Sequence, residues 1–178
     1  MEAIFTMENV SIMLSTAGLA AFIVSFLLKG ANMKAILAIN ALGNILMVIS
    51  YLCVSNANGA LSSIVGAVVG IINYFYAAKE KKIPIWLLCC YAVAFVSVNI
   101  MVFTSWVDIF AIAASLAAVF MISASSGKGY RLWSICNDAL WSVFDILRGS
   151  YGPLLTHGIL TGFTLIGMFM HDFKRKAK

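Results

Sequence analysis

Charged residues are scarce in this chain: Asp, Glu, Lys and Arg make up 11% of its 178 residues. A water-soluble domain carries roughly 25% charged residues, whereas 62% of this chain is hydrophobic and its mean hydropathy is +0.98. So few polar groups could not cover a surface that faces water, so we expect lipid to be the solvent. Seven membrane spans of about 20 residues each would fill the length and leave no room for a soluble domain.

Proline is nearly absent, and no spacing of cysteine and histidine fits a metal site. Pro84 and Pro153 fall where helices are expected to begin, a position that tolerates proline. The four cysteines fall inside apolar runs without a Cys-x-x-Cys spacing, which predicts small buried apolar residues rather than disulfides or metal ligands; they are Cys53, Cys89, Cys90 and Cys136. No phosphate loop, nucleophile elbow or zincin motif occurs. We therefore predict no enzyme, no cofactor and no metal.

Apolar runs separated by charged or turn-forming segments predict an all-α polytopic membrane protein with seven transmembrane helices. The approximate ranges are 4–28, 33–54, 60–78, 84–103, 106–123, 131–150 and 153–171.

The basic residues orient these helices. When the spans alternate, eleven of the twelve Lys and Arg residues fall on one side, in segments 29–34, 79–82, 128–131 and 174–178, and only Arg148 falls on the other. The positive-inside rule makes the basic side cytoplasmic, with the N-terminus outside. The net charge of +5 is then a topology signal and an attraction to anionic lipid head groups. The basic residues are not accompanied by aromatic residues in a pattern typical of nucleic-acid binding.

The two halves of the chain resemble each other. Residues 17–21 (Ala-Gly-Leu-Ala-Ala) return 97 residues later as Ala-Ser-Leu-Ala-Ala, and Gly66-x-x-x-Gly70 returns 92 residues later as Gly158-x-x-x-Gly162. Both halves place basic residues after their first and third helices, so they face the same way. We predict two parallel three-helix repeats, residues 1–82 and 104–178, joined by a linker helix over 83–103, with an axis along the membrane normal.

The sixth predicted helix carries a polar face. At 100° per residue this face holds Ser134, Asn137, Asp138, Trp141, Asp145 and Arg148. Asp138 lies seven residues after Arg131, which places it about 10 Å into the membrane. A carboxylate there costs about 2.5–3.5 kcal/mol, so the face predicts a cavity or polar partners. The alternative is that Asp145 and Arg148 pair with each other near the outer interface.

Other helices add milder polar residues. The second carries a stripe of Asn40, Asn44, Met47 and Tyr51, and the third carries Ser63, Gly66, Gly70 and Asn73. The glycines favour close helix packing, and Asn73 is either an interhelical hydrogen-bond donor or a pocket donor. Asp145 and His157 lie at similar depth across the turn near Ser150, which predicts either a proton relay or a simple buried hydrogen bond.

The plan of three, one and three helices with the N-terminus outside resembles the SWEET and PQ-loop transporter superfamily, and PnuC-type vitamin transporters are similar. The second half resembles the bacterial inner-membrane YgjV family more closely, through Trp133 and Trp141, the Gly149-Ser150-Tyr151-Gly152 turn and the basic end Lys174-Arg175-Lys176. The resemblance implies a helical fold in the bacterial inner membrane. Unlike sugar-transporting SWEETs, the chain has no proline in the first, second, fifth or sixth helix.

These observations lead to the hypothesis of a small-solute transporter with a central site between the two units. Trp141 would stack on the solute, Asp138 and Asp145 would neutralise a cation or carry a proton, and hydrogen bonds would come from Asn40, Asn44, Asn73 and Asn137. A cationic or ring-bearing solute is favoured, and a sugar is the alternative. The expected partners are membrane lipids and the solute, and two fused repeats are compatible with a monomer. The rival hypothesis is a non-transporting scaffold or assembly subunit.

Overall fold

The computed structural model describes residues 6–27, 33–124 and 127–169, and within them the chain forms seven α-helices and no strand. These are α1 (Met7–Leu27), α2 (Met33–Cys53), α3 (Ala57–Ala78), α4 (Ile85–Met101), α5 (Asp108–Ser123), α6 (Gly127–Arg148) and α7 (Tyr151–Met168). The seven predicted helices are confirmed. The largest difference is that α6 begins four residues before Arg131, because a helix continues past the end of its apolar run.

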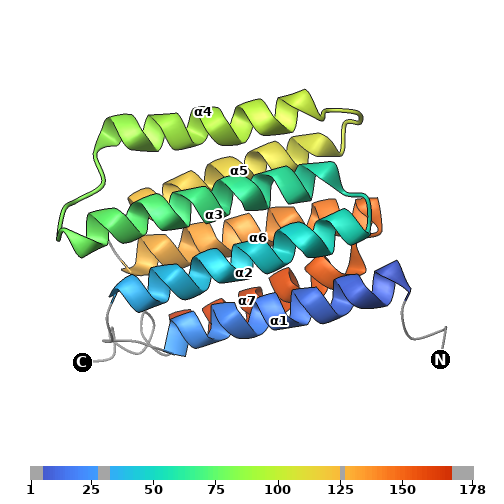
Figure 1. Cartoon of the computed structure of the whole chain (residues 1–178), viewed down its shortest axis with the longest axis horizontal. Coiled ribbons are helices and arrows are strands. Elements are labelled where there is room, and N and C mark those ends of the chain that lie inside the picture. The colour runs from blue at the N-terminus through green and yellow to red at the C-terminus, as the bar shows by residue number, and fades with distance from the viewer. Residues whose placement is uncertain (1–5, 28–32, 125–126, 170–178) are drawn as a thin grey trace.

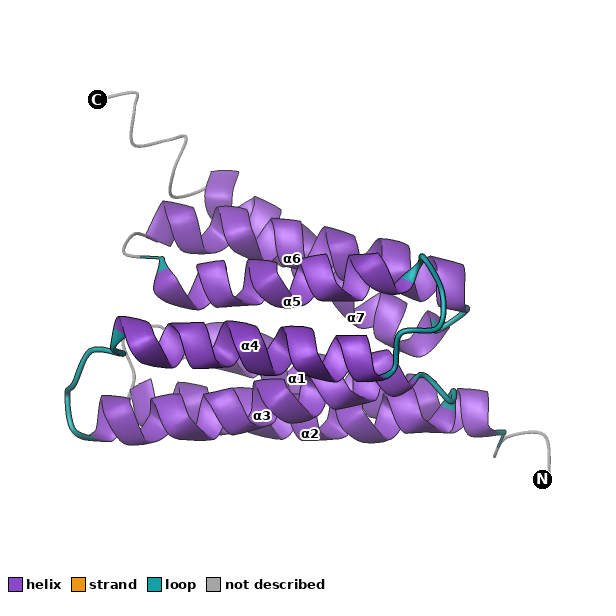
Figure 2. Ribbon diagram, turned by 90° about the horizontal axis from the view of Figure 1, so that it is seen from above, coloured by secondary structure: helices purple, strands orange, loops and turns teal. Residues whose placement is uncertain are grey.

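The helices form two layers (Figures 1 and 2). In one layer α2 packs between α1 and α3, and in the other α6 packs between α5 and α7. At one edge α4 contacts both α3 and α5, and at the opposite edge α1 contacts α7. The two groups of three predicted as repeats therefore lie in separate layers, with α4 beside both.

The surface is apolar and much of the interior is polar, which is the reverse of a soluble protein. On α6 the buried side chains include Ser134, Asp138 and Asp145, whereas Leu132 and Ile146 are exposed. An outward apolar face is stable only where the surroundings are apolar too. This inversion agrees with lipid as the solvent of the chain.

Two stretches of the described residues are long and apolar enough to cross a bilayer, Met7–Val24 and Ala57–Ala78. Leu37–Cys53, Ile85–Met101 and Asp108–Ser123 are also apolar but shorter. The polar face of α6 keeps that helix out of both groups.

Buried polar contacts hold the layers together. Between α1 and α2, the Ser50 hydroxyl donates to the Ser11 carbonyl oxygen (2.9 Å), and its oxygen lies 2.5 Å from the Ser15 hydroxyl oxygen. From α7, Thr156 donates to the Ser15 carbonyl oxygen (3.1 Å). On the far side of the bundle, the Asn99 amide of α4 donates to the Ser62 hydroxyl of α3 (2.9 Å). Hydrogen bonds between helices replace those that water would supply elsewhere.

The two Gly-x-x-x-Gly motifs have different surroundings. A Cβ on Gly66 would meet the Asn44 side chain and one on Gly70 would meet Ala41, both on α2, so this pair permits close packing as predicted. A Cβ on Gly158 or Gly162 would meet nothing within 4 Å.

The cysteine prediction is wrong in one respect. Cys89, Cys90 and Cys136 are exposed rather than buried, and Cys53 is half-buried, all as free thiols. They lie on the outward apolar surface, where a thiol behaves like any small hydrophobic group.

The described basic residues agree with the predicted asymmetry. Lys79, Lys81 and Lys82 follow α3 and Lys128 lies in the first turn of α6, and Figure 1 shows these helix termini at one end of the bundle, called the basic end below. Arg148, the last residue of α6, lies at the opposite end. The basic segments 29–32 and 174–178 lie outside the described residues, and so does the Lys34 side chain.

Candidate functional site

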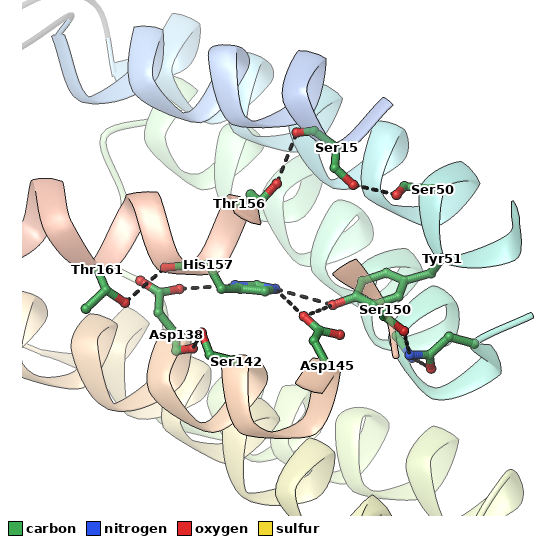
Figure 3. A network of polar contacts seen from close by, with 12 residues as sticks. Ser15, Ser50, Tyr51, Asp138, Ser142, Asp145, Ser150, Thr156, His157 and Thr161 are labelled. Carbon is green, nitrogen blue, oxygen red and sulfur yellow. Dashed lines mark hydrogen bonds and ion pairs between the residues drawn. The ribbon is translucent and has the colours of Figure 1, made fainter. Parts of the chain in front are cut away.

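Four side chains from three helices form a continuous polar chain between the layers; three of them are buried and His157 is half-buried (Figure 3). The His157 ring of α7 lies at its centre. Its Nδ1 lies 3.4 Å from Asp138 Oδ1 on α6, and its Nε2 lies 3.3 Å from the Tyr51 hydroxyl on α2. The same hydroxyl lies 3.3 Å from Asp145 Oδ2 on α6, and His157 Nε2 is 3.8 Å from that oxygen. We call Asp138, His157, Tyr51 and Asp145 the polar chain.

Simple features of the sequence place these groups together. Asp138 and Asp145 are seven residues apart on the buried face of α6, so they are two turns apart and point the same way. The short α6–α7 connection turns α7 back along α6, which brings His157 level with both carboxyl groups. Tyr51 lies near the end of α2 and reaches across from the other layer. Its ring packs on Gly59 of α3, where a Cβ would overlap the ring.

Trp141 covers the polar chain on one side. Its ring stacks on the His157 ring with centroids 5.9 Å apart and an interplanar angle of 12°, and its centroid is 6.1 Å from that of Tyr51. The predicted face for stacking a solute is therefore occupied by His157 in this conformation.

Three of the four groups in the polar chain are deeply buried, His157 is half-buried, and the charge of the polar chain is unbalanced. Asp145 and Tyr51 are 0% and 1% exposed, and Asp138 is 6% exposed. Two carboxyl groups face one imidazole, so ionised carboxylates would leave a net negative charge even with His157 protonated. Among the interactions of the described residues, Asp145 Oδ1 has no hydrogen-bond partner. Within the same residues, no group of three or more His, Cys, Asp or Glu side chains is arranged to hold a metal ion.

Arg148 does not neutralise Asp145, so the predicted alternative of an Asp145–Arg148 pair is wrong. Arg148 Nη2 instead pairs with Asp108 at the start of α5 and donates to the Thr104 hydroxyl (3.0 Å). Asp108 also accepts hydrogen bonds from the Asn58 amide of α3 (2.6 Å) and from two backbone N–H groups before α5, those of Thr104 and Ser105. This cluster, which we call the end clasp, joins α3, α5 and α6. Arg148 pairs with Asp108 rather than with Asp145 because Asp108, the first residue of α5, lies beside the end of α6 where Arg148 is located.

The four predicted asparagines lie outside the polar chain. Asn137 donates to the Ala114 carbonyl oxygen of α5 (2.7 Å), and Asn73 accepts from the Tyr91 hydroxyl of α4 (2.9 Å). Asn44 donates back to the Asn40 carbonyl oxygen within α2 (3.0 Å). In this conformation each of these hydrogen bonds links two neighbouring helices or lies within one helix. Their predicted role toward a solute stays a prediction.

Sequence reasoning did not assign a role to Tyr51, although the polar stripe of the second helix included it. The feature that could have indicated a role for Tyr51 is its hydroxyl group, which lies within an apolar span at the outer end of that stripe. Asp108 was also missed, because its partner Arg148 lies 40 residues away.

The fold and the inverted surface are those of a helical membrane protein. Residues 11–175 match the model of the family Imp-YgjV, described as bacterial inner membrane protein. The chain belongs to this family of bacterial inner membrane proteins. No curated protein and no solved structure matches the chain.

Proposed function

We propose that this protein is a small-solute transporter of the bacterial inner membrane whose working site is the polar chain between the two helix layers. One observation carries the proposal: two buried carboxyl groups and a buried phenol surround a half-buried imidazole where three helices meet. Each buried ionisable group costs free energy in a membrane protein, and such groups usually line substrate or ion pathways. A purely structural bundle would be more stable with apolar residues there.

The position of the polar chain suits transport. Tyr51 comes from one layer, and Asp138, Asp145 and His157 come from the other. Relative movement of the layers would break the contacts of Tyr51 and open the space around Trp141. A cationic or ring-bearing solute fits the excess negative charge and the aromatic wall; a sugar, the alternative substrate, would use the same stacking surface.

Equivalent contacts at the layer edges support the duplicated architecture that such a transporter would use. Ser11 in α1 and Asp108 in α5 are 97 residues apart, the offset of the repeat. Each contacts the N-terminal turns of the third helix of the other layer: a Cβ on Gly152 of α7 would lie 3.0 Å from the Ser11 hydroxyl, and Asn58 of α3 donates to Asp108. We therefore infer seven membrane crossings, arranged as two parallel three-helix repeats joined by a linker helix. The basic end lies in the cytoplasm and the N-terminus lies outside.

The rival function is a membrane scaffold or assembly subunit. The open surface at Gly158 and Gly162 favours it, because exposed small residues permit close contact with a partner helix. A scaffold does not require the polar chain to be ionisable or to be reached from water.

A two-stage experiment tests the transport proposal. Purified protein is first screened by thermal shift against vitamins, nucleosides, sugars and amines, since a ligand at a hundredfold excess over its Kd stabilises the folded state by about 2.7 kcal/mol. Uptake of each stabilising compound is then measured in proteoliposomes, for the wild type and for Asp138→Asn and Trp141→Ala. Thr161→Ala is the matched control, because among the described residues the Thr161 hydroxyl bonds only to the His157 carbonyl oxygen of its own helix.

The proposal predicts uptake by the wild type and the control, and loss of uptake in both test variants. Full uptake in both test variants would remove these residues from the mechanism. A screen without any stabilising compound would favour the scaffold.

A further inference from the structure

We infer that Asp145 holds a proton as a neutral carboxylic acid in this conformation, and that Tyr51 and His157 form a path that passes this proton to Asp138. The inference deepens the proposed function, on which it rests, by naming the proton as the coupling ion. It is carried by the contacts of Asp145 and by the order of donors and acceptors along the polar chain.

The unpartnered oxygen of Asp145 supports the neutral form. As a carboxylate, the side chain would place negative charge on Oδ1, which is buried without a hydrogen-bond donor among the described residues. Leaving a buried charged group unsatisfied costs more than leaving a neutral one. As a carboxylic acid, Asp145 would carry its hydrogen on Oδ2 and donate to the Tyr51 oxygen, which lies 3.3 Å from Oδ2. Tyr51 would then donate to His157 Nε2 instead of to Asp145. Oδ1 is then only a carbonyl oxygen.

Among the described residues, His157 is the group near Asp145 that could carry a positive charge, and Asp145 shares it with Asp138. Tyr51 on α2 and His157 on α7 are its titratable neighbours on other helices, and Asp138 faces the far side of His157. Arg148 on α6 is paired with Asp108 on α5. The layer edge formed by α1 presents neutral hydroxyl groups, Ser11 and Ser15.

A metal ion fits this place less well than a proton. Hard cations such as Ca²⁺ and Mg²⁺ take six or more oxygen ligands. Here the nearest groups are already in mutual contact, with His157 Nε2 3.8 Å from Asp145 Oδ2. A proton needs only the two oxygens that share it.

Transfer along the polar chain balances in protons. In the starting state Asp145 Oδ2–H donates to the Tyr51 oxygen, Tyr51 donates to His157 Nε2, and His157 Nδ1–H donates to Asp138 Oδ1. The O–H bond of Asp145 breaks as its proton moves to Tyr51, the Tyr51 proton forms an N–H bond at Nε2, and the Nδ1 proton moves to Asp138. Asp145 becomes a carboxylate, Asp138 becomes neutral, and His157 changes tautomer. The two carboxyl groups are seven positions apart in the sequence, which corresponds to about 10 Å along α6.

Infrared spectroscopy of the full-length protein in lipid tests the inference without any solute. A buried carboxylic acid gives a C=O stretching band, separate from carboxylate bands, that moves on exchange into D₂O. We expect this band in the wild type, its loss in Asp145→Asn, and its retention in Asp108→Asn. Asp108 is the matched control, because it is equally buried but is paired with Arg148. Tyr51→Phe should keep the band but shift its frequency, because the acceptor of the Asp145 proton is gone.

A band that persists in Asp145→Asn, or one that disappears in Asp108→Asn, would overturn the inference. So would a Tyr51→Phe band identical to that of the wild type. Because Tyr51→Phe removes one oxygen only, it keeps the test valid if Asp145→Asn does not fold. The band does not depend on transport, so a band assigned to Asp145 in a protein without uptake would refute the proposed function and leave the proton site standing.

Discussion

At the scale of single residues, Tyr51 connects the two layers through one hydroxyl group. It is 1% exposed and lies 3.3 Å from both Asp145 and His157. We predict that Tyr51→Phe lowers the free energy of unfolding by about 1–2 kcal/mol, the usual cost of removing a buried hydrogen bond to a polar or charged partner. Thermal unfolding in detergent measures this. Tyr91→Phe is the control, since it removes a buried tyrosine hydroxyl that bonds Asn73 outside the polar chain. A destabilised Tyr51→Phe with unchanged uptake would confine Tyr51 to a structural role.

Gly59 determines where the Tyr51 ring can lie. We predict that Gly59→Ala displaces this ring, because the added Cβ would overlap it, and that the variant reproduces the infrared shift of Tyr51→Phe. Gly158→Ala is the matched control, since its Cβ would meet nothing within 4 Å. If Gly59→Ala left the spectrum unchanged, the ring would not depend on this glycine.

The residues of the polar chain on α6 and α7 were predictable from sequence, whereas their partner on α2 was not. Helical periodicity put Asp138 and Asp145 on one face, and the short turn put His157 at their depth. The role of Tyr51 depends on which face of α2 meets α7. Nothing in the local sequence fixes that choice, because several faces of α2 are apolar enough to pack.

At the scale of helices, α1 and α7 meet across a glycine. A Cβ on Gly152 would lie 3.0 Å from the hydroxyl oxygens of Ser11 and Ser15. We predict that Gly152→Ala destabilises the protein by about 1–3 kcal/mol through overpacking, whereas Gly162→Ala, in open surroundings on the same helix, has little effect. Denaturant unfolding in detergent compares the two. Equal stability of both variants would contradict the close contact at this edge.

The end clasp holds three helices at the end opposite the basic end. Arg148→Ala would leave the buried Asp108 carboxylate with its hydrogen bonds but without its cation. We predict a loss of about 1–2 kcal/mol, at the lower end of values for charged hydrogen bonds because the Arg148 side chain is 31% exposed. Adding Asp108→Asn should recover part of that loss, since no buried charge then remains. A double-mutant cycle measures the coupling, and additive losses would show that the two residues act independently.

Most of the seven helices were predictable because they are long apolar runs between polar turns, and α6 because its polar and apolar residues separate onto two faces at helical spacing. Which helices pack side by side was harder to predict from the sequence. The position of α4 against α3 and α5 depends on contacts such as that between Asn99 and Ser62, which lie 37 residues apart. Charge and hydropathy fix where a helix crosses but not which helix lies beside it.

At the scale of the whole molecule, the inferred orientation makes a prediction about topology. A reporter that is active only in the cytoplasm should be active when fused after Lys178, and one that is active only outside should not. The physical reason is the grouping of Lys and Arg at one side. The opposite pattern would invert the topology and place the end clasp in the cytoplasm.

The central claim is that the space between the layers opens to water during transport. The most direct test is labelling by a membrane-impermeant thiol reagent, in a background without Cys53, Cys89, Cys90 and Cys136. Ser134→Cys lies on the buried face of α6, one turn from Asp138, and Val143→Cys lies on the exposed apolar face. We predict that position 134 reacts, although it is 6% exposed in this conformation, and that position 143 is protected by lipid. Protection of both positions from both sides of the membrane would contradict it.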